Sequence, residues 1–184
     1  MALISQSEVE ARLGRSLTAE EASSFTSINN ALQAYVERMI GSSVESVAAS
    51  TRYYDGGVQH LRIDPCTAIT AVKYVDDDSL VEYTWDSSDY TAEPINRTLK
   101  TMIRNRDGKF NRGINNVSVT AKFSIYDDAS TLYIVRDALI SSLVNEIGNN
   151  NNVKRESIEG YSIEYANTET IDALSKLTYL FPEV

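Results

Sequence analysis

The chain has 184 residues, of which 42% are hydrophobic and 23% are charged, and its formal net charge is −9. This composition indicates a single globular domain with a buried core and argues against a low-complexity or disordered chain. The negative charge argues against tight wrapping of nucleic acid, because phosphate contacts require a surplus of Lys and Arg. With one cysteine, Cys66, neither an internal disulfide nor a cysteine-based zinc site can form within one chain.

The start of the sequence carries no recognisable targeting signal. Residues 1–8 have neither a basic start nor an apolar run of useful length. Elsewhere the unbroken apolar stretches are only a few residues long, so the sequence predicts no membrane-spanning segment. We therefore expect a soluble protein that is made in the cytosol.

Two helices are predicted at the N-terminal end. The first is short, from Gln6 to Leu13, and ends at Gly14. The second begins at a capping box in which Thr18 and Glu21 satisfy each other's backbone amides. Apolar residues then recur every three or four positions, which predicts a long amphipathic helix from Thr18 to about Ile40. Gly41 is the expected stop.

Residues 44–126 are predicted to form a continuous β meander. Residues 51–54 and 59–63 flank the glycine turn Asp55-Gly56-Gly57, which favours a hairpin, and Asp64-Pro65 is expected to end its second strand. Further strands are predicted at 68–75, 80–85, 98–104 and 117–125, with Asp76–Asp78 as a turn and a strand pair around Asp107-Gly108. The last of these strands alternates apolar and polar residues, as expected of a strand with one solvated face.

Helical periodicity returns after the β block. Leu132, Val135, Leu139, Leu143 and Ile147 share one face of a predicted helix, with Ser130 or Asp128 as N-cap and Gly148 as stop. The run of asparagines that follows is expected to be flexible.

A short strand is predicted from Ser157 to Tyr165, and a last helix from about Glu169 to Phe181. The predicted fold class is α+β. It combines a small helical bundle (1–43 and 127–148) with an inserted antiparallel β block (44–126), a flexible loop (149–156) and a C-terminal strand and helix (157–184).

No catalytic or metal site is predicted. His60 is the only histidine, so Ser-His-Asp and Cys-His catalysis depend on this one residue, and its expected role is that of a half-exposed strand residue. Asp76–Asp78 could hold a divalent cation or form a solvated turn, but the calcium-loop pattern is absent. No glycine-rich phosphate loop precedes a helix, and no cofactor is expected.

One stretch of 16 residues holds six of the 17 basic residues and a single acid, Asp107. Its bases are Arg97, Lys100, Arg104, Arg106, Lys109 and Arg112. They could protect an edge strand of a hairpin from unwanted pairing. Alternatively, they contact an acidic partner, a neighbouring subunit or DNA. Among the tyrosines, Tyr53, Tyr54, Tyr161 and Tyr165 are candidates for an interface.

The order of these pieces resembles the head–tail connector (adaptor) family of long-tailed bacteriophages over nearly the whole chain. The matching pieces are the two opening helices, the Tyr54-Asp55-Gly56 turn, the step from Pro65 to Ile69, and a helix that contains residues 135–140. The most specific piece is residues 155–165, which resemble a recurring Glu-Ser-Ile-Gly-x-Tyr-Ser-x-x-Tyr segment of the family. This chain departs from the family in its larger β block and in Glu159 before the glycine.

The resemblance implies a structural virion protein with no reaction to catalyse. Its expected location is the neck of the virion, where copies of the chain, usually twelve, form a ring under the portal protein. Such a ring joins the capsid to the tail, contacts a stopper or tail-completion protein, and lets DNA pass without sequence-specific binding. A closed ring of this kind requires two different complementary patches on each subunit. Isolated subunits of the family are often monomers.

The C-terminal segment, residues 157–184, is the candidate contact with the portal or the adjacent subunit. Its candidate interface residues are Ser157, Ile158, Tyr161, Tyr165, Ile171, Leu174, Leu177, Leu180 and Phe181. Within the same class, a stopper or another neck or tail-completion protein is the alternative. From other classes, a small-ligand-binding module would require a deep apolar pocket that no motif indicates. A metal-dependent nuclease or hydrolase would require clustered carboxylates supported by histidine, and His60 stands alone.

Overall fold

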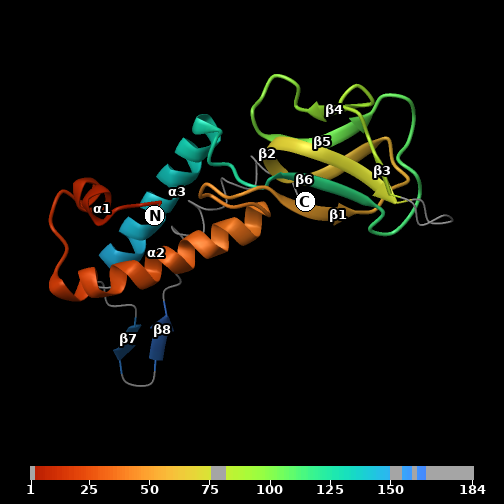
Figure 1. Cartoon of the computed structure of the whole chain (residues 1–184). Helices are drawn as coiled ribbons and strands as arrows, with labels where there is room; N and C mark the ends of the chain where they lie inside the picture. The colour runs from red at the N-terminus through yellow and green to blue at the C-terminus, as the bar shows by residue number, and fades with distance from the viewer. Residues whose placement is uncertain (1–2, 76–81, 150–154, 159–160, 165–184) are drawn as a thin grey trace. The chain divides into compact units, whose positions relative to one another are not determined.

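The computed structural model describes residues 3–75, 82–149, 155–158 and 161–164. It confirms the α+β class, with three helices and eight strands among these residues (Figure 1). The chain divides into two compact units. Among the described residues, the helical unit contains residues 3–39, 133–149, 155–158 and 161–164, and the β unit contains those between Ile40 and Leu132. No described helix combines the length and the hydrophobicity needed to cross a membrane.

Local capping explains where the first two helices begin. In α1 (Gln6–Leu13), the Ser5 amide donates to the Glu8 carboxylate at 2.8 Å, and Gly14 ends the helix with a φ of 70°. In α2 (Ala19–Ile40), the predicted capping box is present. The Glu21 amide donates to Thr18 Oγ1 at 3.2 Å, and the Thr18 amide donates to Glu21 Oε2 at 2.8 Å. Both predicted helices are therefore confirmed.

The third helix, α3 (Ala129–Asn149), begins at a buried aspartate. Asp128 Oδ1 accepts hydrogen bonds from Ser130 Oγ at 2.7 Å and from the Thr131 amide at 3.2 Å, so Asp128 is the N-cap. The helix continues one residue beyond Gly148, the predicted stop. The predicted apolar face is largely buried, because Val135, Leu139, Leu143 and Ile147 are at most 1% exposed.

Two ion pairs connect α1 to α3 within the helical unit. Arg136 pairs with Glu8, and Arg12 pairs with Asp137 at 3.5 Å. The segment before α1 is attached to α2, because Asn29 Nδ2 donates to the Ile4 carbonyl oxygen at 3.2 Å. Exposed ion pairs contribute little stability, so the buried apolar side chains hold this unit together. They include Ile4, Val9, Phe25, Val36, Val135, Leu139 and Leu143.

The β unit is an antiparallel six-stranded sheet in the order β1-β6-β2-β5-β4, with β3 paired to β2. The strands are β1 (Ser50–Tyr54), β2 (His60–Val75), β3 (Glu82–Thr84), β4 (Tyr90–Glu93), β5 (Lys100–Asn105) and β6 (Val117–Lys122). In Figure 1, β2 is the long yellow strand that runs between β5 and β6. It pairs with three strands and is therefore the centre of the sheet.

This topology corrects the predicted meander. β1 and β2 do not pair with each other, so Asp55-Gly56-Gly57 is not a hairpin turn. β5 and β6 do not pair either, because β2 lies between them, so the predicted strand pair around Asp107-Gly108 is also wrong. The predicted break at Asp64-Pro65 is wrong as well. Pro65 lies inside β2, where the pairing with β5 shifts register between Arg62 and Cys66. A residue without an amide hydrogen is tolerated at such an irregularity.

The core of the β unit is apolar and is drawn from β2, β5, β6 and the segments that adjoin them. Its buried members are Leu61, Ile63, Cys66, Val72, Ile103, Phe110, Val117, Val119, Ala121 and Phe123. β6 shows the predicted alternation, since Val117, Val119 and Ala121 are buried and the residues between them are partly exposed. Residues of β2, β5 and β6 therefore share one apolar cluster.

The loop at Gly56 is packed against the segment before β6. The Gly56 amide donates to the Gly113 carbonyl at 3.0 Å and to Asn116 Oδ1 at 2.9 Å. A Cβ atom at Gly56 would lie 1.9 Å from the Asn111 carbonyl oxygen. Only glycine fits this close approach between two backbones.

A small antiparallel hairpin replaces the single strand predicted at residues 157–165. It consists of β7 (Arg155–Ile158) and β8 (Tyr161–Glu164), with Ile158 opposite Tyr161. The predicted flexible run beyond Asn149 and the predicted last helix lie outside the described residues.

Candidate interaction surfaces

The six basic residues between Arg97 and Arg112 lie on different elements of the β unit. Arg97 precedes β5, Lys100 and Arg104 are on β5, and Arg106, Lys109 and Arg112 are in the connection to β6. β5 is flanked by β2 and β4, so it is not an edge strand. The interpretation as protection of a hairpin edge is therefore wrong for β5.

Three of these bases are held by β4 and by the loop after it. Lys100 Nζ donates to the Pro94 carbonyl oxygen at 2.8 Å and to that of Ile95 at 3.1 Å. Arg104 lies 3.4 Å from the Glu93 carboxylate, and Arg106 Nε donates to Thr91 Oγ1 at 2.9 Å. These contacts give Lys100, Arg104 and Arg106 a structural role within the sheet.

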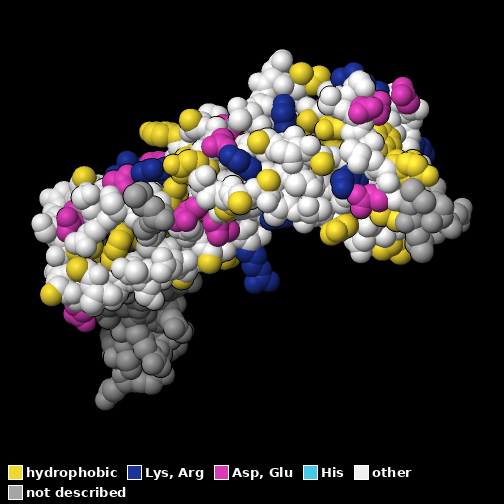
Figure 2. All heavy atoms as spheres, in the orientation of Figure 1, with side chains coloured by type: hydrophobic (Ala, Val, Ile, Leu, Met, Phe, Trp, Pro, Cys, Tyr) yellow, Lys and Arg dark blue, Asp and Glu magenta, His cyan; other side chains and the backbone are white. Residues whose placement is uncertain are grey.

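The other three bases, Arg97, Lys109 and Arg112, are exposed. Within the described residues, their side chains make no hydrogen bond or ion pair with the rest of the chain. On the visible face in Figure 2, Lys and Arg side chains are interspersed with Asp and Glu and form no continuous basic patch. Arg97, Lys109 and Arg112 are therefore the bases that remain free to meet a partner.

A polar cluster around Arg52 lies entirely within the β unit and includes the Gly41 carbonyl group. Arg52 on β1 pairs with Asp64 at 2.6 Å, donates to the Gly41 carbonyl oxygen at 2.7 Å, and lies 4.2 Å from the centre of the Phe123 ring. Tyr54 donates its hydroxyl hydrogen to Asp64 at 3.0 Å. Burial is the main cause that raises the pKa of Tyr54. Every member of this cluster has a neighbour within the chain, so its role is structural.

The two candidate catalytic side chains, Cys66 and His60, lie in different environments, one buried and one exposed. Burial raises the pKa of the Cys66 thiol to about 12, so the thiol is protonated at neutral pH and is a poor nucleophile. His60 is exposed on β2 opposite Arg104. No group of three or more His, Cys, Asp or Glu side chains within the described ranges could hold a metal ion. Asp76–Asp78, considered as a cation site, lie outside those ranges.

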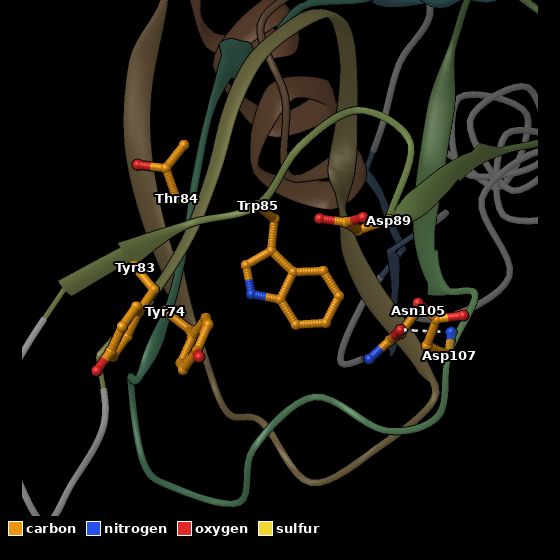
Figure 3. Close-up of a pocket in the computed structure, with 7 residues that line it drawn as sticks. All are labelled: Tyr74, Tyr83, Thr84, Trp85, Asp89, Asn105 and Asp107. Atoms are coloured by element: carbon orange, nitrogen blue, oxygen red, sulfur yellow. Dashed lines mark hydrogen bonds between the residues drawn. The ribbon is translucent and has the colours of Figure 1, made fainter.

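An open cavity of about 420 Å³ lies in the β unit between β3, the start of β4 and the end of β5 (Figure 3). Seven residues line it: Tyr74, Tyr83, Thr84, Trp85, Asp89, Asn105 and Asp107. The indole of Trp85 is at its centre, between the two tyrosines and the two aspartates. The cavity thus has an aromatic wall and an acidic wall.

Aromatic contacts fix the first wall. Tyr74 and Tyr83 are directly opposite in the β2–β3 pair and stack with ring centres 5.0 Å apart. Trp85 meets Tyr74 edge to face at 5.8 Å and packs on buried Phe110 at 4.9 Å. Such contacts hold the rings in defined positions. Tyr83 is 43% exposed and forms the accessible rim of this wall.

Sequence reasoning missed this cavity. Tyr83 and Trp85 are two residues apart within the strand predicted at residues 80–85, and that spacing places their side chains on one face, which was a usable signal. Tyr74 and Asp107 come to the cavity through sheet pairing, which no local pattern reveals.

The predicted C-terminal interface is described only in part. The backbone of Ser157, Ile158 and Tyr161 forms the β7–β8 hairpin. Tyr165, Ile171, Leu174, Leu177, Leu180 and Phe181 lie outside the described residues. Of the other candidate tyrosines, Tyr53 is 62% exposed on β1, whereas Tyr54 belongs to the Arg52 cluster.

Comparison with known proteins finds a similar fold among solved structures. No family model matches the chain, and no curated protein matches it. Among solved structures, the fold is similar to that of a chain from the neck of an empty GTA particle, computed with C6 symmetry. The TM-score is 0.53 at 12% sequence identity, and the match covers 95% of this chain and 88% of the other. At this identity, the similarity establishes a shared fold.

Proposed function

We propose that this chain is a structural subunit of the neck of a phage-like particle, a head–tail connector (adaptor). In this role, copies form a ring under the portal, join the capsid to the tail, and leave a passage for DNA. The observation that carries the proposal is the fold similarity to a chain of a particle neck over 95% of this chain. It agrees with the resemblance of the sequence to the connector family.

The surfaces of the chain suit a subunit that works by contact. Large apolar side chains are exposed on both units, among them Tyr35 and Tyr133 in the helical unit and Tyr53 and Ile114 in the β unit. Exposed aromatic and aliphatic anchors are typical of protein interfaces. A ring of twelve copies, as in the connector family, is compatible with the sixfold symmetry of the similar neck structure.

Deletion of the gene from the particle-encoding genome tests this role. We expect capsids without attached tails, seen by negative-stain electron microscopy, and restoration of tailed particles by the wild-type gene. A tagged copy of the chain should be labelled at the junction of head and tail. Normal tailed particles from the deletion, or label at another place, would contradict the proposal.

Binding to the portal separates a connector from a stopper or another neck protein. A connector co-expressed with the portal protein alone should join it in a stable complex that sediments as a ring. A stopper requires the connector to be present. A chain that joins the particle only when another neck protein is present would support the alternative role.

Residues 157–184 remain our proposed attachment segment. Truncation after Tyr165 removes Ile171, Leu174, Leu177 and Leu180, which share a helical spacing. We expect the truncated chain to keep its melting temperature and to lose incorporation into portal-bearing capsids. A melting temperature far below that of the wild type would instead assign the segment to the core of the chain.

A further inference from the structure

The cavity beside Trp85 combines two kinds of wall. One wall is aromatic and is formed by Tyr74, Tyr83 and Trp85 (Figure 3). The other wall carries the carboxylates of Asp89 and Asp107 together with the Asn105 side chain. None of the seven lining residues is a Lys or an Arg. A space of about 420 Å³ is within the range of small-ligand sites and is large enough for one long side chain.

The acidic wall is held in place by backbone contacts. Asp89 accepts the Asp86 amide at 3.0 Å, and its own carbonyl oxygen accepts the Arg106 amide at 3.0 Å. The Asp107 amide donates to the side chain of buried Asn105 at 2.9 Å. These bonds fix the two loops that carry the carboxylates. The wall is therefore formed before a ligand arrives, which lowers the entropic cost of binding.

The aromatic wall is equally fixed, and the ring of Tyr83 is its accessible part. Trp85 is packed on Phe110, and within the described residues its buried Nε1 has no hydrogen-bond partner. Trp85 and Tyr74 meet edge to face, and the indole N–H is shielded from solvent. Ring faces attract cations, and they attract a planar guanidinium most readily because it can also stack.

We propose that this cavity binds an arginine side chain presented by a segment of another protein. The guanidinium lies against the aromatic wall and donates to the carboxylates of Asp89 and Asp107. Two carboxylates suit the several N–H groups of arginine better than the single ammonium of lysine. The source of the segment, an adjacent protein of the neck, rests on the proposed function. The cavity chemistry itself does not.

The single tryptophan of the chain makes a direct test possible, because Trp85 is the only source of tryptophan fluorescence. The probe is N-acetyl-arginine methylamide, titrated into the purified full chain. The matched control ligand is the citrulline analogue, which has the same shape without the charge. We expect a saturable change in Trp85 emission and a shift of the only indole N–H signal in NMR spectra with the arginine probe. The citrulline analogue should bind at least about tenfold more weakly, since it lacks the charge-assisted bonds.

Variants test the contributions of the acidic wall and the aromatic wall to binding separately. Asp89→Asn together with Asp107→Asn keeps the hydrogen-bond acceptors and should weaken binding of the arginine probe about tenfold or more. The matched control, Asp86→Asn, removes a carboxylate from the same loop without touching the cavity lining and should bind as the wild type does. Tyr83→Leu should also weaken binding, whereas Tyr83→Phe keeps the ring and should not.

Equal responses to the arginine and citrulline probes, or unchanged affinity in the double Asp variant, would overturn the proposal. Failure here is distinguishable from failure of the proposed function. If the tagged chain is found at the head–tail junction but does not bind the arginine probe, only the cavity proposal is wrong. If the chain binds the probe but is absent from the particles, the cavity proposal stands and the proposed function in the neck is wrong.

Discussion

At the scale of single residues, the contact at Gly56 is the tightest constraint in the β unit. We expect Gly56→Ala to destabilise the chain by about 3 kcal/mol, because the added methyl group would collide with the Asn111 carbonyl 1.9 Å away. Denaturant unfolding measures this change. Gly14→Ala is the control. Nothing lies within 4 Å of a Cβ at Gly14, so that variant should cost only about 1 kcal/mol, from its φ of 70°. Equal losses in the two variants would refute the close approach at Gly56.

A second prediction concerns the dependence of stability on pH. Hydrogen bonds from Arg15 and then from the Thr18 amide lower the pKa of Glu21 to about 2, from an ordinary 4.5. As the pH falls, the Glu21 carboxylate therefore takes up a proton in the unfolded chain before it does so in the folded chain. The stabilisation is present above about pH 4.5 and is lost as the pH falls toward 2. The difference in melting temperature between the wild type and Glu21→Gln should be largest near neutral pH and should shrink on acidification.

The exposed neighbour Glu20 provides the control for that measurement, because Glu20→Gln removes a charge from the same turn of α2. It should show a smaller difference from the wild type at neutral pH. A Glu21→Gln variant that differs from the wild type equally at all pH values would show that the ion pair with Arg15 is absent in solution.

At the scale of elements, the start of α3 depends on one carboxylate. Hydrogen bonds from Ser130 and from backbone amides lower the pKa of Asp128 even though burial opposes this. We expect Asp128→Ala to cost about 1 to 2 kcal/mol, measured by chemical denaturation, because the Thr131 amide loses its acceptor. Asp128→Asn keeps an acceptor oxygen and should lose less. If both variants unfold at the same denaturant concentration, Asp128 is not the N-cap.

The helices could be predicted from the sequence because their signals are local. Thr18 and Glu21 are three residues apart, and the residues that repeat along each helix face are three or four residues apart. The strand segments were also recognisable, as in the alternation of β6. Their pairing was not, because β1 pairs with β6 and β2 separates β5 from β6. Strands that follow each other in the sequence, such as β1 and β2, are readily predicted to form a hairpin. The actual strand pairing depends on which apolar faces are buried together in the core.

Pro65 shows at a single position that a local signal can be misleading when strand pairing is unknown. A proline usually ends a strand because it removes a hydrogen-bond donor. Here it lies where β2 shifts register against β5, so the missing donor costs little. The basic stretch could not be interpreted from the sequence for a related reason. Lys100, Arg104 and Arg106 are close in sequence to Arg97 and Lys109. Only the first three contact β4 and the loop after it, and these contacts depend on strand pairing.

At the scale of the whole molecule, the contribution of positive charge to assembly can be tested at the three exposed bases, Arg97, Lys109 and Arg112. We expect Arg97→Glu, Lys109→Glu and Arg112→Glu together to leave unfolding within about 1 kcal/mol of the wild type, since exposed charges contribute little to stability. Incorporation into portal-bearing capsids, or retention of DNA by the particles, should fall. The defect should depend on salt concentration.

Arg104→Glu serves as the contrasting variant, because it places a second carboxylate beside Glu93 in neighbouring strands. It should lower the melting temperature of the isolated chain. If the triple variant assembles and retains DNA as the wild type does at every salt concentration, the exposed bases serve solubility alone.

The pairing of β1 with β6 also determines when the chain can fold during its synthesis. Ser50 of β1 is paired with Ala121 of β6, so this pairing cannot form until β6 has left the ribosome. β2 is completed earlier but must wait for β5 and β6. The first two helices wait longer still, because their unit also contains Tyr133 and the residues after it. Most of the chain therefore emerges before either unit can close, and the exposed strands must avoid other nascent chains during that interval.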